Sequence, residues 1–189
     1  MSLPTSETVF AGSHIDARPT LEAAAFLLDV QSAAIDAVRY ATPTLSQGAQ
    51  QMASAIRAGK SLHYAAAGSS GLMALADASE LRGTFGIPTE KIRIHMAGGV
   101  PVDGHMPGDT EDDGTAAGQI ANEISNGDVV IVLTASGTTP YALAVAHAAQ
   151  HRGATIIGIA NNPGTPLLEL ADTPVCIPTP PEVVAGSTR

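Results

Sequence analysis

The sequence predicts an α/β fold, a doubly wound five-stranded parallel sheet of the flavodoxin-like type that follows an N-terminal helical hairpin. Three observations predict it. Five short apolar runs follow one another after residue 60, helical patterns separate them, and the residues within each run are continuously apolar. Continuous apolar runs are typical of strands buried on both faces. Strands that alternate with helices indicate a parallel sheet with helices on both sides.

The N-terminal third is expected to form an arm and two helices. Residues 1–18 are polar and irregular, which predicts a flexible arm. Apolar residues then recur at three- and four-residue spacing until Pro43 interrupts the pattern, and a second such stretch ends at Gly59. We interpret residues 19–59 as a helical hairpin that packs on the larger domain, residues 60–189.

The larger domain is expected to alternate strands and helices up to its end. Most of its apolar runs end at glycine or asparagine, which are typical of turns. The strands are expected at residues 62–67, 92–97, 129–135, 156–160 and 175–177. The helices are expected at about residues 70–83, 113–126, 139–152 and 165–171.

The composition argues against several classes of function. Eighteen acidic against nine basic residues give a formal net charge of −9, whereas nucleic-acid-binding proteins usually carry a basic surface. No run of about 18 apolar residues occurs, so no membrane partner is expected. The single cysteine, Cys176, has apolar neighbours, which favours a structural thiol in a cytoplasmic protein.

Two loops of similar composition stand at the expected carboxyl ends of the first and third strands. Residues 68–71 read Gly-Ser-Ser-Gly, and residues 136–140 read Ser-Gly-Thr-Thr-Pro. Each loop opens a helix, whose free N–H groups and positive dipole end favour an anion. A strand order of 2-1-3-4-5 would bring both loops to one phosphate. The candidate phosphate-binding residues are Ser69, Ser70, Gly71, Ser136, Gly137, Thr138 and Thr139.

Other interpretations of these motifs stay open or are disfavoured. Serine and threonine are also common at ordinary helix N-caps. Neither loop has the glycine spacing of an NTP or dinucleotide site, so no such cofactor is expected. His147 and His151 lie four residues apart but lack the glutamate of a zinc-binding helix, and no metal site is expected.

Acidic residues for proton transfer occur in two places. Asp77 and Glu80 lie three residues apart on the helix after the first loop, and residues 109–114 read Asp-Thr-Glu-Asp-Asp-Gly. From spacing alone, a solvated helix face is the favoured explanation of the first group, and acids at a helix N-terminus also explain the second. One carboxylate from each segment could serve as acid and base on a single substrate. Spacing alone does not select the pair.

Several short motifs together carry a family resemblance. They are residues 75–80 (LADASE) with 84–88 (TFGIP), 97–99 (AGG), 111–113 (EDD), 135–137 (ASG) with 139–141 (TPY), 162–164 (NPG), and 181–184 (PEVV) with 186–189 (GSTR). In order and spacing, from about Arg18 to the last residue, the chain resembles the N-acetylmuramic acid 6-phosphate etherases. These enzymes belong to the wider class of phosphosugar-binding sugar isomerase (SIS) domains, so the resemblance implies an SIS domain over residues 60–189.

The resemblance implies a lyase without a cofactor that acts on a phosphorylated amino sugar. Such an enzyme opens the sugar 6-phosphate, removes the proton next to the aldehyde carbon, expels D-lactate from C3 and adds water to give N-acetylglucosamine 6-phosphate. By motif position, the two catalytic carboxyl groups are Glu80, the acid at the lactate oxygen, and Glu111, the base. The resemblance also implies a homodimer with its sites near the subunit interface.

The chain departs from the family near the expected phosphate site. Leu72 and Thr138 stand where the family usually has arginines, so two cations are absent. Family members also continue into further helices beyond the position of Arg189. Two alternative functions therefore stay open: a phosphosugar-binding protein without catalysis, and an aldose–ketose phosphosugar isomerase.

Overall fold

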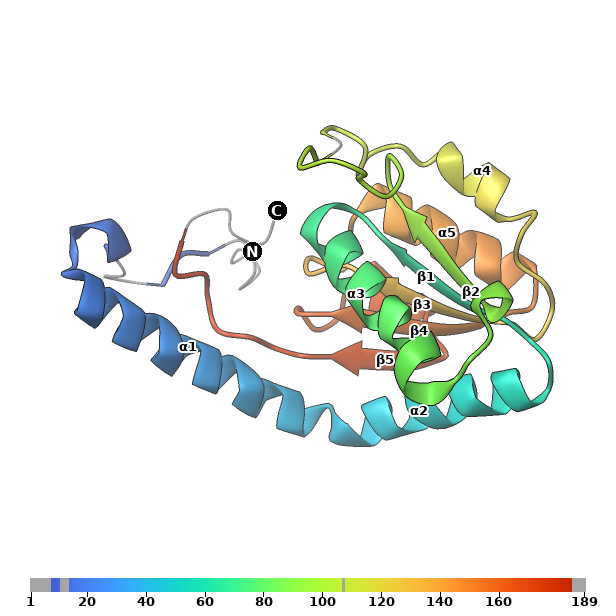
Figure 1. The fold of residues 1–189 in the computed structure, drawn as a ribbon, viewed down its shortest axis with the longest axis horizontal. Coiled ribbons are helices and arrows are strands. Elements are labelled where there is room, and N and C mark those ends of the chain that lie inside the picture. Colours follow the sequence, from blue (N-terminus) through green and yellow to red (C-terminus); the bar gives the residue numbers. More distant parts are fainter. Residues whose placement is uncertain (1–7, 11–13, 107, 185–189) are drawn as a thin grey trace.

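The computed structural model describes residues 8–10, 14–106 and 108–184 (Figure 1). Strands and helices alternate in it from β1 onward. The strands are β1 (Leu62–Ala66), β2 (Ile92–Met96), β3 (Val129–Leu133), β4 (Thr155–Ala160) and β5 (Thr173–Cys176). The α-helices are α1 (Thr20–Tyr40), α2 (Thr42–Arg57), α3 (Gly68–Phe85), α4 (Ala116–Ile120), α5 (Pro140–His151) and α6 (Pro166–Leu170).

The strands form one parallel sheet in the order β2-β1-β3-β4-β5, which confirms the predicted doubly wound fold. Tyr64 in the middle of β1 pairs with Ile94 of β2 on one side and with Ile131 of β3 on the other. The chain therefore changes its direction of travel across the sheet between β2 and β3. The loops that follow β1 and β3 meet at this switch point, where α/β sheets of this kind bind ligands.

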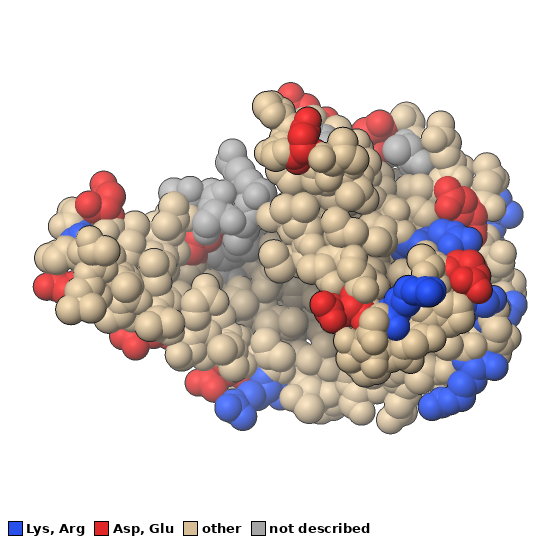
Figure 2. All heavy atoms as spheres, in the orientation of Figure 1, with Lys and Arg blue, Asp and Glu red and all other residues tan. Residues whose placement is uncertain are grey.

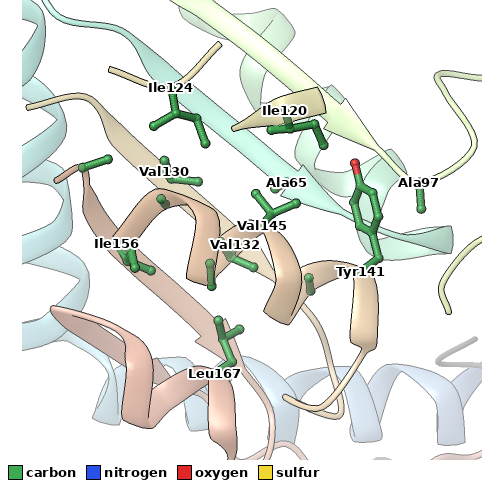
Figure 3. Close-up of a cluster of buried hydrophobic side chains, with 14 residues drawn as sticks. Ala65, Ala97, Ile120, Ile124, Val130, Val132, Tyr141, Val145, Ile156 and Leu167 are labelled. Carbon is green, nitrogen blue, oxygen red and sulfur yellow. The ribbon is translucent and has the colours of Figure 1, made fainter. Parts of the chain in front are cut away.

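Helices cover both faces of the sheet, and each face has its own core. On one face, Val145 of α5 packs over Val130 and Val132 of β3, and Tyr141 lies at the end of the same cluster (Figure 3). On the other face, α2 and α3 bury mainly alanines, among them Ala55, against the strands. Small side chains let these helices approach the sheet closely, which suits a sequence with few aromatic residues.

The two N-terminal helices form as predicted, but they do not fold back on one another as a hairpin. Figure 1 shows α1 running on from α2 in a shallow arc and projecting from the body. Ala41 alone separates them and keeps near-helical backbone angles. Its N–H donates to the Val38 carbonyl at 3.0 Å, and its carbonyl accepts from the N–H of Leu45 at 2.9 Å. Pro43 lies in the first turn of α2, where a missing N–H costs no hydrogen bond.

Two segments from opposite ends of the chain pair beside α1. Val9 forms a parallel bridge with Glu182, and the ring of Phe10 meets that of Phe26 on α1 edge-on, with centroids 5.8 Å apart. The predicted arm, residues 1–18, falls partly outside the described residues. The part that is described is thus held by contacts with α1 and with the segment after β5.

The helix predicted at residues 113–126 is much shorter in the structure, and α4 covers only Ala116–Ile120. The chain then makes turns, in which the N–H of Ser125 donates to Asp128 Oδ2 at 2.8 Å. Ile124 reaches the same core as α4 from this turn. The apolar spacing that suggested a long helix is therefore satisfied without one. Within the described part of the chain, no helix is both long and apolar enough to span a membrane.

Candidate phosphosugar site

A pocket of about 460 Å³ lies at the carboxyl ends of β1 and β3. Three segments contribute to it: the β1–α3 loop, the acidic segment before α4, and the β3–α5 loop. Its lining residues are Ala67, Gly68, Ser70, Glu111, Asp112, Leu133, Thr134, Ala135, Ser136, Thr138, Thr139 and Pro140. The strand order thus brings the two hydroxyl-bearing loops to one cavity.

The first loop contributes one of its three candidate residues to this pocket. Ser70 lines it from the first turn of α3, whereas Ser69 lines a smaller pocket next to it. Gly71 lies within the helix and packs against β2, where an added Cβ would meet Met96 Cγ at 2.8 Å. Gly71 therefore allows α3 to pack closely on the sheet and does not line either pocket.

The second loop presents a cluster of hydroxyl groups bonded to one another. Thr134 Oγ1 lies 2.7 Å from Thr139 Oγ1 and 3.2 Å from Ser136 Oγ. The backbone N–H and the hydroxyl of Thr138 donate to Ser136 Oγ at 3.2 and 3.1 Å. These bonds fix the loop geometry, and hydroxyl hydrogens can rotate toward a bound anion. The cluster is therefore well suited to hold phosphate oxygens.

Gly137 forms the back of this loop and does not line the pocket. Its φ of +76° lies in the left-handed region, and an added Cβ would meet Thr165 Oγ1 at 2.3 Å. The Gly137 carbonyl accepts a hydrogen bond from the N–H of Leu167 at 3.2 Å. Glycine is required here both by backbone conformation and by the contact with Thr165. The loop between β4 and α6 thus supports the β3–α5 loop from behind.

Glu111 lines both the main pocket and the smaller one. Its carbonyl accepts a hydrogen bond from the N–H of Tyr141 at 3.0 Å, which ties the acidic segment to the start of α5. Tyr141 is buried, and burial together with the nearby Asp113 carboxylate raises the pKa of its hydroxyl to about 12. Its phenol therefore stays neutral. The backbone N–H of Tyr141 holds Glu111 beside the second loop.

Glu80 lies apart from this pocket. It is exposed on α3, and its carboxylate accepts a hydrogen bond from the hydroxyl of Thr84 at 3.1 Å. Ten residues of helix separate it from Ser70, which corresponds to about 15 Å along the axis. Glu80 is absent from the described lining of both pockets. Within one chain, the structure does not bring Glu80 and Glu111 together.

The smaller pocket, of about 250 Å³, opens on the other side of Gly68. Leu72 from α3 and Met106 from the long β2–α4 loop give it an apolar wall, and Glu111 stands between it and the main pocket. Leu72 occupies the position where the sequence comparison expects an arginine. A group placed here would therefore meet an apolar surface beside a carboxylate.

Among the residues that the structure describes at the site, only backbone and hydroxyl groups can offer partial positive charge to an anion. The described linings of the two pockets contain no lysine, arginine or histidine, while Asp109, Glu111 and Asp112 are acidic. The 18-residue helix α3 and the 12-residue helix α5 both direct their N-termini toward the main pocket. Free N–H groups and helix dipoles at such ends bind phosphate without a cationic side chain.

A buried polar chain lies outside both pockets. His63 Nδ1 lies 2.9 Å from His95 Nε2, and His63 Nε2 lies 3.3 Å from Asp128 Oδ2. Asp128 also accepts the backbone N–H of Ser61 at 2.9 Å. Burial lowers the pKa of His63 against the opposing effect of Asp128, and burial, together with the neighbouring His63 and Arg93, lowers the pKa of His95 to about 4. Both rings are therefore neutral near pH 7.

Sequence reasoning missed three residues that shape the second loop: Thr134, Asn162 and Thr165. The amide of Asn162 donates to the carbonyl of Ala135 at 3.1 Å. Thr134 is a polar residue inside an otherwise apolar run, and that interruption was the available signal. Thr165 had no such signal, because its role depends on a contact with Gly137 that only the folded chain makes.

Comparisons with known proteins find relatives over most of the chain. An SIS domain matches residues 104–189. The N-acetylmuramic acid 6-phosphate etherase of Deinococcus radiodurans is 40% identical over 167 residues, which are 87% of this chain and 55% of that protein. The enzyme of the same name from Symbiobacterium thermophilum is 34% identical over 176 residues, 93% of this chain and 59% of that protein.

The fold is also that of a solved sugar-phosphate enzyme. The phosphoheptose isomerase from Francisella tularensis aligns with a TM-score of 0.60 and 20% identity, over 91% of this chain and 88% of that one. The resemblance seen in the sequence motifs is therefore confirmed, as is the SIS fold. The chain spans little more than half the length of the curated relatives it matches.

Proposed function

Since this chain carries an SIS domain and is related over most of its length to N-acetylmuramic acid 6-phosphate etherases, we propose that it is an etherase of this kind. It acts on a phosphorylated amino sugar, N-acetylmuramic acid 6-phosphate, and releases D-lactate and N-acetylglucosamine 6-phosphate. The observation that carries the proposal is one pocket in which Ser70, the hydroxyl cluster of the β3–α5 loop and Glu111 stand together.

The phosphate is held by the two loops at the helix N-termini. Ser70, Ser136, Thr138 and Thr139 supply hydroxyl groups, the first turn of α3 supplies backbone N–H groups, and α5 contributes the positive end of its dipole. Ser69 lines the smaller pocket, so we assign it to the sugar rather than to the phosphate. Gly137 acts by fixing the loop.

The reaction is an elimination followed by an addition of water. Glu111 takes the proton from C2 of the open-chain sugar, and the C–H electron pair forms the C2–C3 double bond. The C3–O bond breaks as Glu80, the general acid, gives a proton to the departing lactate oxygen. Water then adds its hydroxyl group to C3 and a proton to C2. The overall change is hydrolysis of the ether and needs no redox partner.

Glu80 reaches this pocket from a second copy of the chain. Within one chain Glu80 lies about 15 Å from Ser70 along the axis of α3 and faces solvent. A homodimer in which each copy donates Glu80 to the other satisfies the need for two carboxyl groups. This is the arrangement proposed for the active protein.

A second candidate is a protein that binds a phosphosugar without converting it. The separation of Glu80 from Glu111 and the acidic, cation-free pocket lining favour it. It predicts the same phosphate-dependent binding with no dependence on Glu80. The other alternative left open by the sequence, an aldose–ketose phosphosugar isomerase, differs from the etherase because it releases no lactate from any substrate.

The test is D-lactate release from N-acetylmuramic acid 6-phosphate, followed for the wild type and for Glu111→Gln and Glu80→Gln. Each variant is expected to lose at least about 100-fold in rate, as general acid–base groups do. Glu90→Gln, an exposed glutamate outside the pocket, is the matched control. No release by wild type, with phosphosugar binding intact, would favour the binding protein.

Mixing the two inactive variants tests the donated carboxylate. Heterodimers carry one intact site of two, so random exchange restores about a quarter of the wild-type rate. A mixture that stays inactive, while subunit exchange is demonstrated, would place both carboxylates in one chain.

A further inference from the structure

Helix α1 carries an apolar stripe that nothing in the described chain covers. Leu21, Leu28 and Ile35 recur every seven residues, so they lie on one face of the helix. They are 83%, 68% and 61% exposed. In Figure 2 most of the projecting arm is tan, with acidic side chains spaced along its edge. A row of leucine-type side chains in water is unusual for a surface helix and marks an interaction surface.

The face of α1 opposite the stripe is held by contacts within the chain. Phe26 meets Phe10 from the N-terminal segment, and Ala37 is buried. Arg39 lies one turn beyond Ile35 on the stripe face and forms an exposed ion pair with Asp36 at 3.0 Å, which marks the end of the stripe. The Leu21–Leu28–Ile35 stripe is therefore a distinct apolar face and not part of the packing around the N-terminal segment.

The body carries an apolar groove of about 580 Å³ between α2 and α3, with the sheet as its floor. Leu45 and Met52 of α2 form one wall, Met73 of α3 stands on the other, and Ile159 lies on the floor. Met73 is 65% exposed. The one carboxylate among the described lining residues, Asp77, accepts a hydrogen bond from the Tyr64 hydroxyl at 2.6 Å.

The nearly continuous course of α1 and α2 shows how a second copy would cover both the α1 stripe and the α2/α3 groove. Because α1 continues α2 in one shallow arc, a two-fold axis near their junction at Ala41 sets the helices of two copies antiparallel (Figure 1). The α1 of each copy then lies beside the α2 of the other, along the open side of the groove. Such an exchange is self-complementary, as an isologous interface requires.

The area involved is sufficient for a stable dimer. A helix of 21 residues is about 30 Å long, and half of its surface is roughly 500 Å² at a radius of about 5 Å. Because each chain contributes both a helix and a groove, about 1,000 Å² is covered on each copy. Stable interfaces cover about 800 Å² per partner.

We propose that the Leu21–Leu28–Ile35 face of α1 docks into the α2/α3 groove of a second copy of this chain, and that the exchange is reciprocal. The proposal rests on the homodimer proposed above and assigns its interface. It also explains why α1 projects from the body with large apolar side chains in water.

The test is the oligomeric state of four proteins, measured by light scattering on a gel-filtration column: wild type, Leu28→Glu, Met73→Glu and Ala33→Glu. Leu28 and Met73 are exposed in the single chain, so a glutamate there leaves its fold intact, which circular dichroism checks. Ala33→Glu introduces the same charge on the other, exposed side of α1 and is the control. We expect dimers for wild type and Ala33→Glu, and a shift of at least tenfold in dissociation constant for the other two.

A second measurement joins the two surfaces directly. Leu28→Cys and Met73→Cys, each made with Cys176→Ser and carrying different tags, are mixed and oxidised. A disulfide between the two different chains supports the proposal. Dimers that persist in both glutamate variants, with no mixed disulfide, would overturn the interface while the homodimer stands. A monomeric wild type would overturn both, and activity measured separately decides the proposed reaction.

Discussion

The α-carbon of Gly137 lies so close to Thr165 that a methyl group on it would stand 2.3 Å from Thr165 Oγ1. This contact joins the β3–α5 loop to the loop that opens α6. It fixes the position of Ser136 and Thr138 on either side of the glycine. The shape of the pocket therefore depends on a residue that does not line it.

Gly137→Ala is expected to abolish phosphosugar binding. It should also lower the free energy of unfolding by more than the strain of a left-handed backbone would, because the added methyl group collides with Thr165. Gly164→Ala is the matched control, because its φ of +66° is also left-handed but an added Cβ there meets nothing within 4 Å. The control should cost about 1–2 kcal/mol. Urea unfolding and calorimetric binding measure both effects. Equal losses in the two variants would mean that the contact with Thr165 is unimportant.

Thr165→Val is expected to raise the free energy of unfolding by about 1 kcal/mol. Thr165 Oγ1 is buried without a hydrogen-bond partner, and an unsatisfied hydroxyl is costly compared with a methyl group of the same shape. Thermal unfolding reports the change. A loss of stability beyond about 1 kcal/mol would show that the hydroxyl has a partner in solution.

Ser136→Ala is expected to weaken phosphosugar binding by about tenfold with little effect on stability. Ser136 Oγ accepts two hydrogen bonds from Thr138, so its loss frees the loop and removes a donor to the phosphate. Ser79→Ala serves as the control, since its hydroxyl is exposed on α3 and bonds only to the Leu75 carbonyl at 2.6 Å. Unchanged affinity in Ser136→Ala would remove the hydroxyl cluster from the site.

The buried histidines predict how stability changes with pH. The pKa of His95 falls from 6.5 to about 4 on folding, so the unfolded chain binds a proton that the folded chain does not. Stability is therefore complete above pH 6.5 and is lost as pH falls toward 4, by about 3 kcal/mol from this group. Chemical unfolding between pH 7 and pH 4.5 measures the slope.

His95→Gln should flatten that slope, whereas His147→Gln on the exposed side of α5 should leave it unchanged. An identical slope in His95→Gln and wild type would show that another group is responsible. His63 contributes in the same direction, because burial lowers its pKa as well.

The sequence was sufficient to predict the sheet because its strands are buried on both faces and read as continuous apolar runs. It also placed Ser70 and Ser136 at the correct ends of neighbouring strands, since strand order follows from the fold class. Local patterns did not predict the direction of α1, because Ala41 can continue a helix as readily as it can turn one. The family resemblance, and no local pattern, assigned Glu80 and Glu111 to one site, and ten residues of helix separate Glu80 from Ser70 in a single chain.

The central claim is that the two loops bind the phosphate of an amino sugar. The most direct measurement is calorimetric titration of this chain with N-acetylglucosamine 6-phosphate and, separately, with N-acetylglucosamine. We expect binding of the phosphorylated sugar and at least a 100-fold weaker affinity for the sugar without phosphate. Equal affinity for the two sugars, or no binding of either, would contradict the assignment of the pocket.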